Sequence, residues 1–168
     1  MKEGSNRRLA SLACLLGLSL ILYTIESQLP PPVPLPGVKL GLANIITLVT
    51  MVLFGRKSAF EVLILRILLS SILTGSGIGL LYSMAGGVFC FVLMAVLFPA
   101  AREQLWAVSM LGAIAHHAGQ LAAAAVVTGS WAVFSYLPIL TVAGMITGCF
   151  TGLCAMFCLK RWNQRWEK

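Results

Sequence analysis

The sequence contains no aspartate, and charged residues make up only 10% of it. Enzymes that transfer diphosphate groups hold Mg²⁺ through aspartate-rich sites, so this absence excludes a site of that kind. The chain also lacks a glycine-rich loop ending in Lys and Ser or Thr, so we do not expect it to hydrolyse ATP by itself. Its five cysteines form no C-x-x-C pair and lie in apolar runs, where they are expected to pack as small apolar side chains. These absences argue against an enzyme and indicate neither a cofactor nor a metal.

Hydrophobic residues are the abundant class, at 59% of the chain, and the mean hydropathy is +0.93. Soluble domains carry about a quarter charged residues, so this composition predicts an integral membrane protein. The net charge of +7 would suit nucleic-acid binding, but the basic residues stand at the ends of apolar runs. That placement is typical of residues that orient membrane helices. We therefore expect a multi-pass protein of the cell (plasma) membrane, surrounded by the lipid bilayer and without a nucleic-acid partner.

Six apolar segments divide the chain, and most approach the roughly 20 residues that a helix needs to cross a bilayer. They cover approximately residues 9–25, 38–54, 59–74, 78–98, 105–128 and 136–159. This pattern predicts an all-α integral membrane protein, a bundle of six transmembrane helices that forms a single domain over residues 1–168. A proline-rich loop at residues 27–37 follows the first segment, and its prolines favour a stiff, extended backbone.

The positions of Lys and Arg test this count. They precede segment one, join segments two and three, join segments four and five, and follow segment six. With six crossings all these positions fall on one side, which the positive-inside rule makes the cytoplasm. Both termini are therefore expected in the cytoplasm, with the proline-rich loop outside the cell.

Two basic residues, Lys39 and Arg66, do not fit this pattern because they lie inside predicted helices. Lys39 is near the outer end of its segment, where its side chain can also extend to the headgroups. Glu26, at the outer end of the first segment, is a possible partner for it across the loop. Arg66 lies deeper, so an internal ion pair or an anionic ligand is the better explanation for it.

A second polar group lies in segment five, in the stretch GAIAHHAGQ. His116 and Gln120 share one helix face, whereas His117 is turned about 100° away. Adjacent histidines with no nearby acid are a weak signal for a metal. Two alternatives stay open: the polar side chains form hydrogen bonds between helices, or they form one wall of a ligand cavity.

Polar groups from three segments are expected at one depth, in the outer half of the bilayer. Such convergence favours a cavity that binds a small molecule. The candidate substrate-binding residues are Lys39, Asn44, Arg66, Ser70, His116 and Gln120. In this hypothesis the two cations attract an anionic group, and the amide and histidine side chains orient the rest of the molecule.

Small residues recur at every fourth position, a spacing that lets helices approach closely. Gly144, Gly148 and Gly152 form such a stripe in segment six, and Ala13 and Gly17 form one in segment one. The default interpretation is packing within the bundle. In segment one, the stripe is alternatively an exposed surface that docks another membrane subunit.

Several stretches resemble the Gx transporter family, whose members are often labelled heptaprenyl diphosphate synthase component I. These stretches are LPPPVPLPGVKLGLANIITLV, RILLSSILTGS, YSMAGG, LGAIAHHAGQ and YLPIL with the later GMITG. The resemblance covers nearly the whole chain. One departure is His117, which stands at a position that is often Asn in the family.

The family in turn is similar to the substrate-binding S-components of energy-coupling factor transporters, six-helix membrane proteins that capture vitamins or related small molecules. This resemblance implies a transmembrane T-component and two cytoplasmic ATPases as partners, with Ala13 and Gly17 on the docking face. It also implies a ligand related to prenyl compounds, quinones or flavins. The synthase label implies an alternative: a non-catalytic membrane accessory subunit of a heptaprenyl diphosphate synthase or of a quinone-linked electron-transfer assembly.

Overall fold

The computed structural model describes residues 2–30, 33 and 38–166, excluding the side chains of residues 2–5 and 161–166. All regular structure in this part of the chain is helical, which confirms the all-α class. The elements are α1 (Lys2–Ser27), α2 (Asn44–Thr74), α3 (Gly77–Leu97), α4 (Leu105–Thr128), the 3-10 helix η1 (Trp131–Tyr136) and α5 (Leu137–Trp166). The predicted proline-rich loop at 27–37 lies mostly outside the described residues.

The described chain has five α-helices where the sequence predicts six. The difference lies in α2, which contains most of the predicted segment 38–54 and all of 59–74. Gly55, with φ 85° and ψ 173°, interrupts this helix and separates a first arm, residues 44–54, from a second arm, residues 56–74. Glycine adopts a positive φ without the steric cost that other residues meet. The chain therefore bends at a single residue and needs no separate loop there.

The start of α2 also differs from the prediction, since the helix begins at Asn44 and not near Val38. Residues 38–43 form a non-helical segment, in which Gly41 has a φ of 85°. The Gly41 N–H donates to the carboxylate of Glu26 at the end of α1, not to a helical carbonyl. Lys39 therefore belongs to this irregular segment and not to a helix.

Four helices of the described chain are long and apolar enough to cross a membrane, which supports a multi-pass membrane protein. They are Asn6–Ser27, Gly77–Leu97, Leu105–Thr128 and Trp131–Lys160, and they correspond to predicted segments one, four, five and six. Neither arm of α2 is among them. The first arm is about 16 Å long at 1.5 Å per residue, well short of a hydrocarbon core of about 30 Å. The second arm carries several charged residues, one of which, Arg66, is buried.

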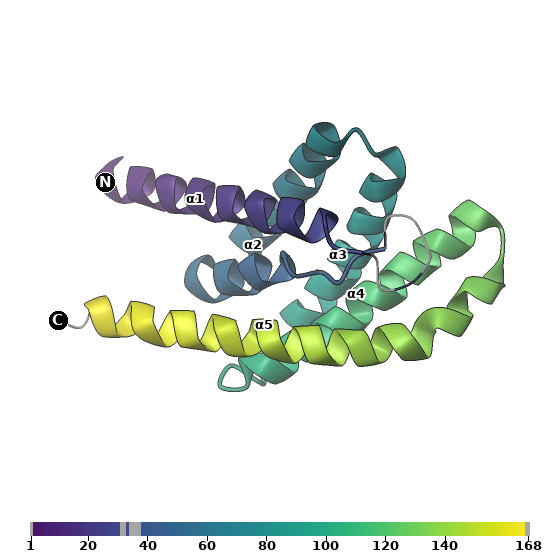
Figure 1. The fold of residues 1–168 in the computed structure, drawn as a ribbon. Helices are drawn as coiled ribbons and strands as arrows, with labels where there is room; N and C mark the ends of the chain where they lie inside the picture. Colours follow the sequence, from purple (N-terminus) through teal and green to yellow (C-terminus); the bar gives the residue numbers. More distant parts are fainter. Residues whose placement is uncertain (1, 31–32, 34–37, 167–168) are drawn as a thin grey trace.

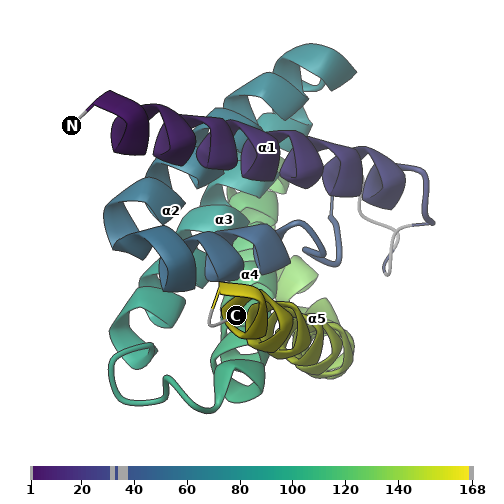
Figure 2. The same ribbon diagram turned by 90° about the vertical axis from the view of Figure 1, so that its left-hand side faces the viewer.

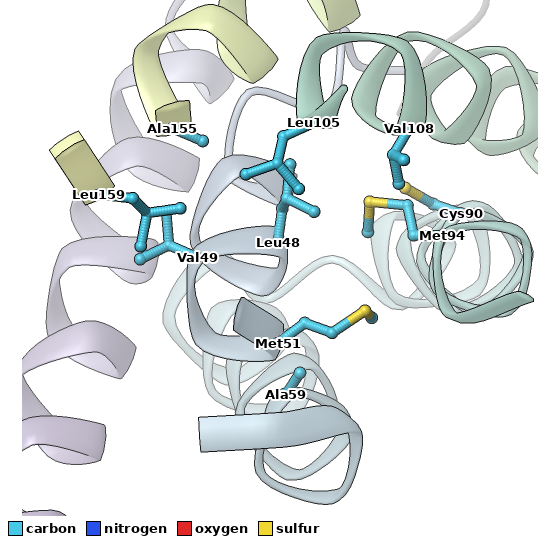
Figure 3. Close-up of a cluster of buried hydrophobic side chains, with 10 residues drawn as sticks. All are labelled: Leu48, Val49, Met51, Ala59, Cys90, Met94, Leu105, Val108, Ala155 and Leu159. Atoms are coloured by element: carbon cyan, nitrogen blue, oxygen red, sulfur yellow. The ribbon is translucent and has the colours of Figure 1, made fainter. Parts of the chain in front are cut away.

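The first arm of α2 occupies the centre of the fold, between α1 and α5 in both ribbon views (Figure 1, Figure 2). Buried side chains from four helices meet beside it (Figure 3). Leu48 and Met51 come from this arm, Met94 from α3, Leu105 from α4 and Leu159 from α5. The described N-terminal end of α1 and C-terminal end of α5 lie at the same end of the molecule (Figure 1).

Helices α4 and α5 pack closely because glycines of α5 face the backbone of α4. A Cβ built on Gly152 would lie 2.5 Å from Trp106 Cα, and one on Gly148 would lie 2.6 Å from another Cα of α4. No side chain fits at such distances, so the two helices meet backbone to backbone. Ser109 and Thr151 add a hydrogen bond, with 3.0 Å between their hydroxyl oxygens. The glycine stripe predicted in segment six is therefore an internal packing surface.

Candidate ligand-binding site

The six residues predicted to bind a ligand meet near the start of α2. The irregular segment contributes Lys39, α2 contributes Asn44, Arg66 and Ser70, and α4 contributes His116 and Gln120. All except Lys39 are buried, with exposed fractions of 8% or less, and Lys39 is half-buried. The structure therefore brings the predicted residues together, but on a bent helix, an irregular segment and α4, not on three straight helices. We refer to these six residues, with Tyr23 and Glu26 described below, as the polar cluster.

Gln120 connects α4 to the irregular segment. In the amide orientation that satisfies its neighbours, its oxygen accepts from the Lys39 backbone N–H at 3.1 Å and from His116 Nε2 at 3.2 Å. Its nitrogen donates to the Lys39 carbonyl oxygen at 3.0 Å. This arrangement puts the proton of the neutral His116 ring on Nε2 and leaves Nδ1 as an acceptor. Glycine at position 86 makes room for that ring, because a Cβ at Gly86 would lie 2.8 Å from Nδ1.

Three charged side chains meet in this part of the protein. Arg66 donates from Nη2 to the side-chain oxygen of Asn44 at 3.5 Å, a long hydrogen bond. Glu26 is 4% exposed, accepts the Gly41 N–H, and is attracted electrostatically to Arg66 and Lys39. The expected proximity of Glu26 to Lys39 is therefore supported, with Arg66 as a second cation. One carboxylate faces two cations, so with neutral histidines the cluster has an excess of one positive charge.

Tyr23 is a member of the polar cluster that was not predicted from the sequence. The Lys39 ammonium nitrogen lies 3.4 Å from the centroid of its ring, which is a cation–π contact. Its hydroxyl interacts with the side chains of Ser70 and Ser83, on α2 and α3. Tyr23 and Glu26 are three residues apart on α1 and share one helix face, so both side chains reach the cluster. The end of α1 therefore closes one side of the cluster.

Several buried polar atoms of the described site have no hydrogen-bond partner. They are Asn44 Nδ2, Arg66 Nε, His116 Nδ1 and both ring nitrogens of His117. Buried polar groups in folded proteins are nearly always paired, because leaving one unpaired costs about 1–3 kcal/mol. The atoms of Asn44 and Arg66 are donors, so an acceptor such as a carbonyl, carboxylate or phosphate oxygen would satisfy them.

The cavity that adjoins Asn44 is small in this conformation. A cavity of about 10 Å³ lies between α2, α3, α4 and α5, and its lining includes Asn44, Ser109 and Thr151. That is room for about one water molecule. A larger ligand therefore requires the polar cluster to open, and the irregular segment, whose Leu40 and Gly41 line the cavity, is part of its cover.

The two histidines face different neighbours, although their ring centroids are only 5.8 Å apart. His116 turns toward α3 and the irregular segment. His117 turns toward α5, where a Cβ added at Gly144 would lie 2.9 Å from its Cδ2. Among the residues that the structure describes, no three His, Cys, Asp or Glu side chains gather closely enough to hold a metal ion.

The second predicted site, the small-residue stripe of α1, faces outward. Ala13 is exposed, Gly17 is partly exposed, and a Cβ added at Gly17 would meet no atom within 4 Å. This differs from the glycine stripe of α5, which is covered by α4. Within the described chain, the stripe of α1 is thus not used for close helix packing.

The family model described as heptaprenyl diphosphate synthase component I matches residues 15–158, which include the whole polar cluster. Searches of curated proteins and of solved structures gave no match. This match covers most of the chain, and the chain belongs to the heptaprenyl diphosphate synthase component I family.

Proposed function

We propose that the chain is a membrane-embedded binding subunit that captures a small anionic or oxygen-rich molecule in the polar cluster. The observation that carries this proposal is the combination of two cations, one carboxylate and unpartnered N–H donors in a largely buried site. Charged groups inside membrane proteins are costly and occur where they pair or serve a ligand. Here the pairing is incomplete, which favours a ligand over purely structural hydrogen bonds.

The chemistry of the cluster narrows the class of ligand. Its excess positive charge favours an anion, and the unpartnered donors of Asn44 and Arg66 favour carbonyl, carboxylate or phosphate oxygens. Apolar residues, among them Leu40 and Met94, line the small adjoining cavity, and they would contact the apolar part of a ligand only after the cluster has opened. A prenyl, quinone or flavin-related molecule with an anionic or carbonyl end combines these features, and it is the class that the family resemblance implies.

We further propose that both arms of α2 lie within the plasma membrane and complete a six-segment bundle with both termini in the cytoplasm. Arg8 donates from Nη2 to the Ser58 hydroxyl at 2.8 Å, which brings the start of α1 beside Arg56 and Lys57 at the bend of α2. A concentration of cations at one end is what the positive-inside rule expects of a cytoplasmic face. Glu26 lies about 27 Å further along α1, so the polar cluster belongs to the outer half.

In this proposal the chain works as an S-component-like subunit, and a transmembrane T-component with cytoplasmic ATPases supplies the energy for transport. The open stripe of Ala13 and Gly17 supports such docking, because small residues let a partner helix approach the α1 backbone closely.

A non-catalytic accessory subunit is the second candidate function, and the family's description as a synthase component favours it. Such a subunit would anchor a heptaprenyl diphosphate synthase or a quinone-linked electron-transfer assembly at the membrane. The polar cluster would then serve only packing. This function requires a stable protein partner and no bound small molecule.

The two functions differ in what co-purifies with the protein. Small molecules would be extracted from the purified wild type, Lys39→Gln and Arg66→Gln, and identified by mass spectrometry. Arg56→Gln is the matched control, because it removes a cation that is exposed at the bend of α2. We expect a compound with an anionic or carbonyl group on the wild type and the control, and depletion of that compound in both site variants.

Size-exclusion chromatography of the four proteins reports whether each variant is folded. A compound retained equally by all four proteins would contradict the assignment of the site. If no compound is found and a synthase or redox subunit stays attached, the accessory function replaces the binding function.

A further inference from the structure

A groove of about 410 Å³ lies on the surface between the start of α4 and the C-terminal part of α5. Its lining is mostly apolar. It includes Leu105, which is buried, and Leu153, which is 52% exposed. Cavities of about 300–1,000 Å³ accept ligands of small-molecule size. The groove is thus large enough for a substantial part of a lipid molecule.

The groove exists because the glycine stripe of α5 ends before the helix does. Gly152 packs directly on the α4 backbone at Trp106. The next two positions at the same spacing are Met156 and Lys160, which lie on the same helix face and line the groove. Their larger side chains prevent an equally close approach of the two helices, so a gap opens beyond Gly152.

Charged side chains accompany the apolar lining. Arg102, from the loop before α4, and Lys160, from α5, are exposed cations that line the groove, and Glu103 is an exposed carboxylate beside them. The guanidinium carbon of Arg102 lies 5.3 Å from the centroid of the Phe98 ring, which helps to hold this side chain in place. The groove therefore combines an apolar surface with a net positive charge.

We propose that this groove binds an anionic phospholipid of the cytoplasmic leaflet, with its phosphate at Arg102 and Lys160 and an acyl chain along Leu153 and Met156. The groove lies at the ends of two candidate membrane spans, α4 and the helix that ends at Lys160, where the headgroup region begins. Anionic lipids of the cytoplasmic leaflet attract Lys and Arg at such positions. The inference rests on the proposed orientation of the bundle and not on the ligand in the polar cluster.

The experiment is native mass spectrometry of the full chain in detergent with equal amounts of phosphatidylglycerol and phosphatidylcholine that carry the same acyl chains. The wild type should retain phosphatidylglycerol preferentially. Arg102→Gln and Lys160→Gln should each lower the preference about five-fold, which corresponds to about 1 kcal/mol per cation. Glu103→Gln removes the opposing charge and should raise the preference for phosphatidylglycerol. Arg56→Gln and Lys57→Gln are matched controls that remove exposed cations outside the groove, and they should leave this preference unchanged.

Retained binding of phosphatidylcholine and an unchanged size-exclusion profile show that a variant is folded. Where Lys160→Gln or Arg102→Gln does not fold, the increase in phosphatidylglycerol preference expected for Glu103→Gln still tests the proposal. A phosphatidylglycerol preference that survives in both groove variants would overturn it. An equal loss in the two control variants would also overturn it, because the preference would then come from the overall charge of the protein.

Discussion

Arg66→Gln is expected to destabilise the folded protein, and Glu26→Gln is expected to cost less stability in that variant than in the wild type. Both side chains are buried, at 3% and 4% exposed, and they attract each other electrostatically. Removing the charge of Arg66 leaves the Glu26 carboxylate with Lys39 as its cation. It also removes the guanidinium donor of the Asn44 side-chain oxygen.

The size of the loss follows from this geometry. Removing one partner of a directly paired buried ion pair costs about 3–5 kcal/mol in the free energy of unfolding, and this range is an upper bound for Arg66, which attracts Glu26 without a direct salt bridge. We place Arg66→Gln at the lower end, about 3 kcal/mol, because Lys39 still attracts the carboxylate and the bond to Asn44 is long. Glu26→Gln should cost less, about 1–3 kcal/mol, since its amide oxygen can still accept the Gly41 N–H.

A double-mutant cycle in detergent micelles measures the coupling, with denaturant unfolding followed by circular dichroism. The double variant Glu26→Gln with Arg66→Gln should be more stable than the sum of the single losses predicts, by about 1–3 kcal/mol. Arg56→Gln, at an exposed position, should stay within about 0.5 kcal/mol of the wild type. Strictly additive losses would mean that the two side chains do not interact, and they would refute the electrostatic reasoning for the polar cluster.

Three further predictions concern glycines and a buried hydroxyl. Gly41 and Gly75 both have a positive φ, but only a Cβ at Gly41 would meet a side-chain atom within 3.0 Å. Gly41→Ala should therefore lower the melting temperature more than Gly75→Ala. A smaller shift for Gly41→Ala than for Gly75→Ala would contradict the packing around the irregular segment. Gly152→Ala should lower the melting temperature, whereas Gly17→Ala, with open space at its Cβ, should not; similar shifts would argue against the close contact of α4 and α5. Ser109→Ala should cost about 0.6 kcal/mol in unfolding free energy, the average for a hydrogen bond between membrane helices, and no measurable loss would mean that the hydroxyl pair does not stabilise the protein.

Helix boundaries were predictable where local sequence decides them. The predicted segment 105–128 coincides with α4, whose end is set by Gly129 in the left-handed conformation, with φ 64°. The start of α3 is equally local, since the Ser76 hydroxyl accepts the Gly79 N–H at 3.0 Å. In both places an apolar run stops at residues that favour a turn, so hydropathy and turn chemistry agree.

The irregular segment before α2 was not predictable from hydropathy because distant side chains determine it. Residues 38–54 are apolar enough for a continuous helix, but Glu26 of α1 and Gln120 of α4 bond the backbone at Gly41 and Lys39. The polar residues of the site stand out in apolar segments and could be predicted. Tyr23 could not, because a tyrosine near the end of a membrane segment is also typical of an interfacial anchor.

Native mass spectrometry of the purified protein gives the most direct test of ligand binding in the polar cluster, because it measures the fraction of molecules that carry a bound small molecule. We would compare the wild type with Glu26→Gln and Arg66→Gln. Glu26 competes with an anionic ligand for the two cations. The fraction of molecules with a bound ligand should therefore be at least as high in Glu26→Gln as in the wild type, and it should be lower in Arg66→Gln. Equal occupancy in all three, or no bound molecule in any, would mean that the cluster serves packing and is not a binding site.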